Sequence, residues 1–194
     1  MMKKLFLIFA MIFLWALSPM YADAETTGIV GTQDTALFIQ IDPNGVGKIK
    51  ETENLIGEEV ANKLKASGHE ILPIAETQQN LRIYLRENAD TVTQRGSDEG
   101  VILKSQDFKA LGNLVNTHYV VLIASRITSA EVKEGFWEDR KNLTVLTEVV
   151  VFDAQNGKYL MDEEFSNVGT TGGSYDTAYR RAIKEMLKQV VFSY

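Results

Sequence analysis

The sequence predicts an α/β domain with α+β character: a single mixed sheet of about five strands in the order β-α-β-α-α-β-β-β-α, with helices packed on it. Three observations predict this class. Residues 175–191 repeat apolar side chains at helical spacing. Residues 119–124 are apolar on both faces, which is typical of a central strand in a covered sheet. Residues 143–153 alternate and precede Asn156-Gly157, a dipeptide that favours a tight hairpin turn.

The first half of the domain begins with a strand. Residues 35–41 alternate weakly and end at a turn cluster, so they predict this first strand. Residues 51–67 predict a helix, because apolar side chains recur along one stripe and Gly68 suits a left-handed cap. Residues 69–74 predict a second short strand, and residues 77–89 predict a second helix.

The second half contains the hairpin and the last helix. Residues 91–100 lack periodicity and predict a surface loop. Ser105 is a suitable N-cap for a third helix that ends near Asn116. After the hairpin turn, residues 158–167 predict the returning strand, and the glycine-rich residues 169–173 lead into the last helix. Two strands would enter through helical crossovers and three would form a meander.

The first 24 residues predict a cleavable signal peptide. Two lysines precede thirteen apolar residues at 5–17, a run shorter than the roughly 20 residues that a membrane-spanning helix needs. An Ala-x-Ala sequence ends at Ala24 and marks the cleavage site. We expect residues 25–34 to form a flexible arm and residues 35–194 to form a single domain. The alternatives are an uncleaved anchor or a buried core helix.

Composition excludes several chemical classes. The chain has no cysteine, which excludes disulfides, thiolate metal sites, a cysteine nucleophile and a cysteine-attached lipid. The net charge is −6 and becomes −7 when the signal peptide is removed, which argues against nucleic acid and against an anionic membrane surface. We therefore expect an exported protein, periplasmic or extracellular, that is not lipid-anchored. We expect no cofactor, no metal, no nucleic acid and no stable membrane insertion after signal removal.

Two glycine-containing segments resemble ligand loops, and each also has a simpler interpretation. Residues 42–53 match several positions of a calcium loop, but Val46 occupies a ligand position, so a strand-to-helix loop is the favoured interpretation. Residues 169–174 precede a helix whose amides could hold a phosphate, but they lack the lysine of a P-loop. A connection with Ser174 as N-cap is favoured instead.

The acidic and histidine residues do not predict a catalytic set. Residues 162–164 (Asp-Glu-Glu) could supply paired carboxylates, but consecutive strand residues point to opposite faces, which favours a solvated strand end. His69 and His118 are the two histidines, and each begins a predicted strand. Without cysteine or convergent partners they favour structural or surface roles.

Phe136 and Trp137 are the candidate partner-binding residues. They lie in a charged connection between two predicted strands. Large aromatic side chains at an exposed tip are favoured anchors at protein interfaces. The alternative is that both rings fold back onto the edge of the sheet.

Two passages resemble the TolB amino-terminal and CsgG-like domains of the bacterial envelope. Residues 111–122 (LGNLVNTHYVVL) resemble their helix and following strand, and residues 149–158 (VVVFDAQNGK) resemble their hairpin. The similarity covers roughly residues 34–192. It implies a TolB-N/CsgG-like fold that docks to other proteins in the periplasm or outer envelope. The missing cysteine and the short, charged segment 128–142 depart from the curli-secretion members, so a secretion pore is not implied.

These observations lead to one expected function and one alternative. We expect an exported, non-enzymatic envelope protein that binds envelope proteins or a second copy of itself, as a binding or assembly accessory. The alternative is a small-ligand-binding or hydrolytic α/β domain that uses loops at the carboxyl ends of its strands. A pocket with convergent polar groups near residues 42–48 would favour the alternative.

Overall fold

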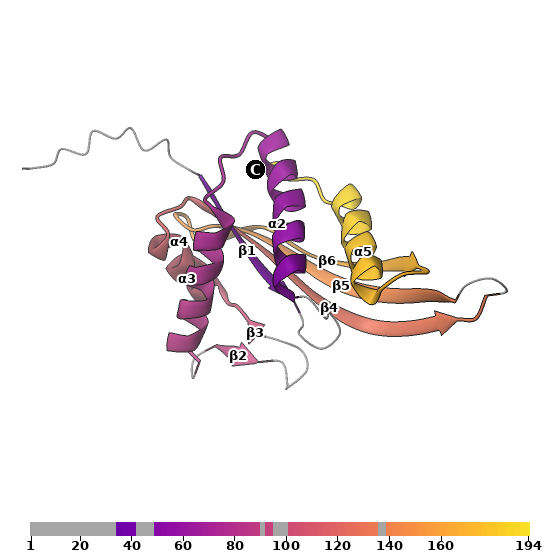
Figure 1. Cartoon of the computed structure of the whole chain (residues 1–194). Coiled ribbons are helices and arrows are strands. Elements are labelled where there is room, and N and C mark those ends of the chain that lie inside the picture. The colour runs from indigo at the N-terminus through magenta and orange to yellow at the C-terminus, as the bar shows by residue number, and fades with distance from the viewer. Residues whose placement is uncertain (1–33, 42–48, 90–91, 95–100, 136–138) are drawn as a thin grey trace, which may run out of the picture. The chain divides into compact units, whose positions relative to one another are not determined.

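The computed structural model describes residues 34–41, 49–89, 92–94, 101–135 and 139–194, all within one compact unit (Figure 1). Its helices are α2 (Ile49–Ala66), α3 (Ile74–Glu87), α4 (Ser105–Leu114) and α5 (Tyr175–Gln189). Its strands are β1 (Thr35–Ile41), β2 (Thr93–Gln94), β3 (Val101–Ile102), β4 (Tyr119–Lys133), β5 (Arg140–Asp153) and β6 (Lys158–Thr171). None of these helices is both long and apolar enough to cross a bilayer. The expected signal peptide lies outside the described residues.

One mixed sheet forms the centre of the fold. Its strand order is β1-β4-β5-β6, with β1 parallel to β4 and the other neighbours antiparallel. The run at residues 120–123 is buried between β1 and β5, which confirms the expected central strand. The described residues between β1 and β4 include the helices α2, α3 and α4, and parallel strands need a long crossover connection of this kind.

The sheet has four strands rather than about five, because residues 69–74 do not form a strand. They make a single bridge, between Ile71 and Thr35, and two backbone hydrogen bonds to Thr35 of 3.1 and 3.0 Å. Pro73 follows at once and precedes the first residue of α3. Because proline has no backbone N–H and disfavours continuation of a ladder, pairing stops after this one contact.

The segment before α4 differs from the prediction in two details. Part of the expected loop at residues 91–100 pairs instead, because β2 and β3 form a short antiparallel ladder. Helix α4 begins at Ser105, so its N-cap is Lys104 and not Ser105. The Asp107 carboxylate accepts a 2.7 Å hydrogen bond from the Lys104 backbone N–H, which holds the first turn.

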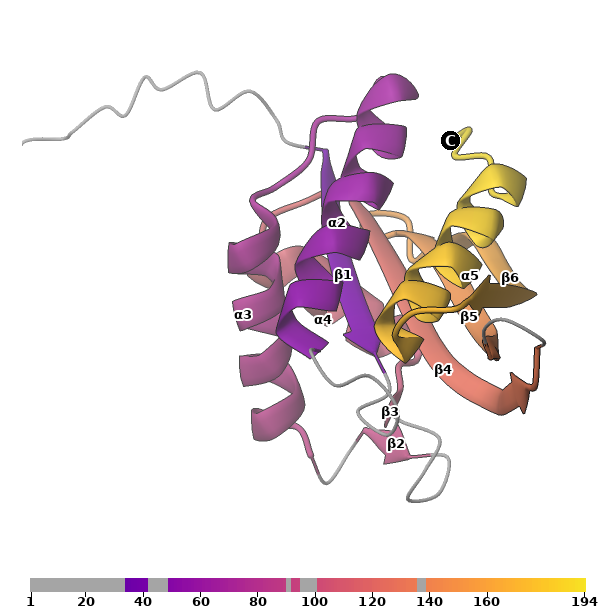
Figure 2. The ribbon, with the colours of Figure 1, turned by 45° about the vertical axis from the view of Figure 1, so that its right-hand side comes forward.

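Each face of the sheet has its own apolar core (Figures 1 and 2). Helices α2 and α5 cover one face, where Leu64 and Tyr179 are fully buried. Helices α3 and α4 belong to the core of the other face, with Phe108 and Phe152. On β5 this second core ends at Val150, and the next residue on the same face is the half-buried Glu148.

Strand β6 is longer than predicted and packs closely on α5. It continues to Thr171, so Gly169 belongs to the strand and not to a connection. A Cβ atom at Gly169 would overlap the backbone carbonyl of Ala178 in α5, which explains why glycine is needed there. Ser174 then accepts a 3.3 Å hydrogen bond from the Thr177 N–H, and this confirms its expected role as the N-cap.

Candidate functional site

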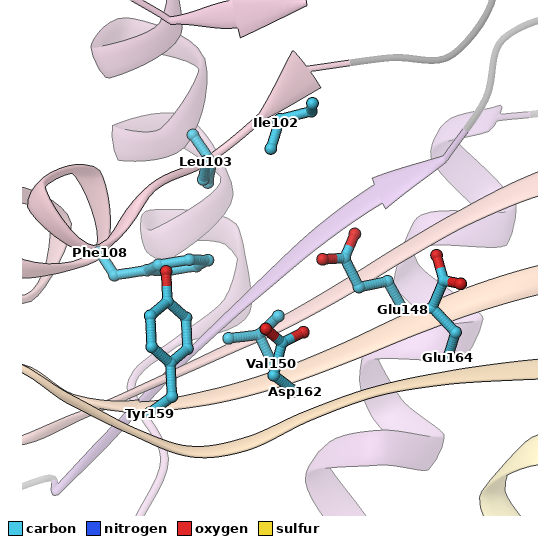
Figure 3. A pocket seen from close by; sticks show the side chains of 8 residues that line it. All are labelled: Ile102, Leu103, Phe108, Glu148, Val150, Tyr159, Asp162 and Glu164. Atoms are coloured by element: carbon cyan, nitrogen blue, oxygen red, sulfur yellow. The ribbon is translucent and has the colours of Figure 1, made fainter. Parts of the chain in front are cut away.

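A pocket of about 310 Å³ lies on the second face of the sheet, where β5 and β6 pass beneath β3 and the start of α4 (Figure 3). Half of its lining is apolar or aromatic and half carries oxygen atoms that face the opening. The lining residues are Ile102, Leu103, Phe108, Glu148, Val150, Tyr159, Asp162 and Glu164. The pocket is therefore amphipathic, with an apolar floor and an acidic side.

A β-bulge in β6 decides which side chains face this pocket. Next to the turn, Tyr159 pairs with Phe152, but beyond the bulge Met161 pairs with Val151, which leaves Leu160 without a partner in the register. One extra residue reverses the alternation of faces along the rest of a strand. As a result Asp162, an even-numbered residue, shares a face with the odd-numbered Tyr159.

The aromatic floor is rigid because its rings contact one another. Phe108 stacks on Phe152 with ring centroids 5.5 Å apart, and Tyr159 meets Phe152 edge-on at 5.0 Å. Phe108 lies in the first turn of α4, which Asp107 fixes by accepting hydrogen bonds of 2.7 Å from Lys104 and from the Tyr84 hydroxyl. Figure 3 shows the Tyr159 hydroxyl beside Phe108, and 38% of Tyr159 is exposed.

The acidic side contains a pair of glutamates in directly opposite positions. Glu148 of β5 pairs with Glu164 of β6, and Asp162 pairs with Val150 beside them. Figure 3 shows the two glutamate carboxylates extending from the sheet in the same direction. Like charges in directly opposite positions disfavour strand pairing, and cationic groups beside them offset this repulsion.

The electrostatic effect of these carboxylates appears at Tyr159. The pKa of its phenol is raised above the ordinary value of 10.0, first because the ring is partly buried. The second cause is the negative charge of Asp162, followed by that of Asp107 and Glu148. The phenol therefore stays neutral and acts as a hydrogen-bonding group on the rim of an acidic pocket.

The side chains of this lining offer a surface for a cationic group. The eight residues include no histidine, serine, threonine or lysine, so a hydroxyl or amine nucleophile with a histidine base is missing from this pocket. Asp162 and Glu164 are exposed and Glu148 is half-buried, whereas an acid kept protonated for hydrolysis needs an apolar enclosure. In the described part of the chain, no three histidine, aspartate or glutamate side chains converge as metal ligands.

Several predicted site residues are not placed by the structure. Phe136 and Trp137 lie outside the described residues, and so does the loop at 42–48 on which the calcium interpretation and the small-ligand alternative depend. The roles predicted for them stay predictions. The glycine-rich residues 169–173 are placed, but they end β6 and lead to α5 as described above.

The two histidines lie near one end of the main sheet, beside the residues that begin β1 and β4 and end β5. The His69 Nδ1 atom is 3.4 Å from an Asp34 carboxylate oxygen, and the His118 Nε2 atom is 3.4 Å from an Asp153 carboxylate oxygen. His69 stacks on Tyr194, with ring centroids 4.2 Å apart. Each histidine thus has one acidic neighbour, in keeping with the structural or surface role expected for both.

This pocket was not predicted from the sequence, because only consecutive residues within 162–164 were compared. Asp162 and Glu164 are two positions apart and share a face, which the period of a strand predicts. Glu148 could not be assigned in the same way. Regular continuation of the Phe152–Tyr159 pairing would place Glu148 opposite Glu163, and the bulge at Leu160 places it opposite Glu164 instead.

Comparisons with known proteins give similarity of fold. No protein-family model matches the sequence, and no curated protein matches it. Lipoprotein GNA1162 from Neisseria meningitidis is 14% identical, with 81% of this chain and 99% of that chain covered and a TM-score of 0.42. A minor lipoprotein from Acinetobacter baumannii is 9% identical, with 82% and 90% covered and a TM-score of 0.38. The LpoB C-terminal domain from Salmonella enterica is 12% identical, with 70% and 82% covered and a TM-score of 0.35.

These neighbours correct the expected location of the protein. They are bacterial lipoproteins of similar fold, so the expectation that the chain is not lipid-anchored is wrong. That expectation came from the absence of cysteine, which excludes one chemical link to a lipid and not every mode of attachment. None of the three is described as a TolB or CsgG-like domain, so that finer resemblance stays a prediction.

Proposed function

We propose that this chain is an exported, non-enzymatic envelope protein that binds other proteins, and that the pocket between β3, α4, β5 and β6 holds a basic side chain of its partner. The observation that carries the proposal is the group of three carboxylates on one face of the sheet, at Glu148, Asp162 and Glu164, beside an apolar floor. Such a surface attracts cations and repels phosphates and nucleic acids.

A lysine or arginine side chain fits both halves of the pocket. Its aliphatic stem can pack on Val150 and Phe108, while its charged end reaches the carboxylates. An arginine could also donate hydrogen bonds to the carboxylates of the opposed pair Glu148 and Glu164, and it could lie on the ring of Tyr159. A free metal ion would use the acids and leave the apolar floor without a role.

The proposal also includes expectations from the sequence that the structure does not test. These are cleavage after Ala24, a flexible arm at 25–34, a single domain at 35–194, and a TolB-N/CsgG-like role as an assembly accessory. Phe136 and Trp137 would provide a second, apolar contact at the end of the β4–β5 hairpin. A partner that engages both regions would be an envelope protein or a second copy of this chain.

Site-specific crosslinking in the cells that make the protein tests this function. A photo-reactive amino acid replaces Tyr159, and a control replaces Val191, which is 66% exposed beyond α5. We expect position 159 to crosslink to defined envelope proteins through segments that contain lysine or arginine. The crosslinks should be lost when Glu148→Gln and Glu164→Gln are added.

Two results would contradict the proposal. One is recovery of uncrosslinked protein alone at position 159, and the other is capture of the same proteins from positions 159 and 191. Retention of the crosslinks in the double glutamine variant would also contradict it, because the carboxylates would then have no part in binding.

A further inference from the structure

The two edges of the main sheet differ in how they are covered. At the β1 edge, the Gln78 side chain accepts from the Ile39 N–H at 2.8 Å and donates to the Ile39 carbonyl at 2.9 Å. Thr77 donates to the Leu37 carbonyl at 2.6 Å. Side chains of α3 therefore take the place of a neighbouring strand, and this edge is closed to further pairing.

The β6 edge is covered at one end only. The Arg181 guanidinium of α5 donates to the Thr170 carbonyl, and Gln189 donates to the Asn167 side chain at 2.7 Å. Between Lys158 and Ser166 most residues are exposed, and no strand of the described chain pairs with the outer side of β6. The backbone N–H and C=O groups on that side are available to a strand from another chain.

The open part of this edge is also the acidic part. Asp162 and Glu164 face the pocket, and Glu163 points to the opposite face beside the partly buried Met161 and Phe165. Two copies of β6 paired edge to edge would bring these acids close together, and like charges across strands disfavour that pairing. A strand of opposite charge is favoured by the same interactions.

We propose that an extended, basic segment of a partner protein adds to the sheet along Lys158–Ser166, with lysine or arginine at every second position. This inference rests on the proposed function and specifies how the partner binds. Alternate side chains of an added strand would lie beside Asp162 and Glu164 on the pocket face. The side chains between them would lie on the face of Met161 and Phe165, so apolar residues fit there.

Synthetic peptides of nine residues test this arrangement with the purified protein. One peptide alternates lysine and valine, and a second has the same composition with its lysines in one block. Two more carry the alternating sequence with backbone N-methyl groups, either on every lysine or on every valine. In a strand the amides of alternate residues point to opposite edges, so each of these two peptides has one blocked edge.

The affinity of each peptide for the protein is measured by calorimetry. The alternating peptide binds more tightly than the block peptide, and one N-methylated peptide binds while the other does not. The double variant Asp162→Asn/Glu164→Gln binds roughly tenfold more weakly, as the loss of two exposed ion pairs implies. The control Glu163→Gln, with its side chain on the other face, changes affinity by less than about twofold.

The results separate failure of this inference from failure of the proposed function. If both N-methylated peptides bind like the parent, or both lose binding equally, strand addition is wrong. Loss of affinity in the acid variant would then still support a basic side chain in the pocket. If no basic peptide binds, or if the acid variant binds normally, the proposed function is wrong as well. A protein dimer that the peptide does not dissociate would assign the edge to a second copy and overturn the inference.

Discussion

At the scale of single residues, the pocket depends on where the side chains of β6 point. Tyr159 provides a rim hydroxyl above the aromatic floor, and the carboxylates of Asp162 and Glu164 follow along the same face. The raised pKa of the Tyr159 phenol reports their negative charge, because it combines partial burial with the nearby acids. This tyrosine is therefore an internal probe of the electrostatics on which binding depends.

The substitution Asp162→Asn is predicted to lower the pKa of Tyr159 toward its ordinary value of 10.0, because it removes the largest single charge effect on the phenol. NMR titration of the tyrosine ring signals between pH 8 and 12 measures this shift. Glu163→Gln is the matched control, since that side chain points to the other face of β6. An unchanged Tyr159 titration in Asp162→Asn would show that the carboxylate does not act on this site.

Part of this site could be predicted from the sequence and part could not. The shared face of Asp162 and Glu164 follows from strand periodicity alone. The addition of Tyr159 and Glu148 to that face requires the bulge at Leu160, which no local sequence signal marks. The residue types thus predict that acids lie on β6. Only the pairing of β5 with β6 shows which acids lie side by side.

At the scale of secondary structure, several elements lie where the sequence predicted them. Strand β1 and the first half of β4 are found where alternation and apolar runs place them, and α5 begins at Tyr175 after the Ser174 cap. Residues 69–74 do not form the predicted strand, because Pro73, the N-cap of helix α3, follows after a single bridge.

The contact between β6 and α5 gives a prediction at this scale. Gly169→Ala is expected to reduce the free energy of unfolding by about 1–3 kcal/mol, because a Cβ there would overlap the Ala178 carbonyl and push the helix away. Gly173→Ala is the control, since its Cβ would lie 3.4 Å from the nearest atom, Thr171 Oγ1. Urea unfolding followed by circular dichroism compares the two. Equal stability of both variants would contradict the close contact.

At the scale of the whole domain, the sheet is covered unequally. One face lies under α2 and α5 along β5, while the core on the other face stops at Val150 and gives way to acidic residues. One edge is closed by α3 side chains and the other is open beside the same acids. The open edge and the acidic face meet at β6, which makes this strand the centre of the proposed binding surface.

The most direct test of this account is a map of amide chemical shifts in the ¹⁵N-labelled protein as the alternating lysine–valine peptide is added. The account predicts that the largest changes fall on β5 and β6, at Glu148, Tyr159, Asp162 and Glu164, and that α2 and the buried face of α5 change little. Changes that centre on α2 and α5, or no changes at saturating peptide, would contradict the claim that the acidic face of β6 binds a basic partner.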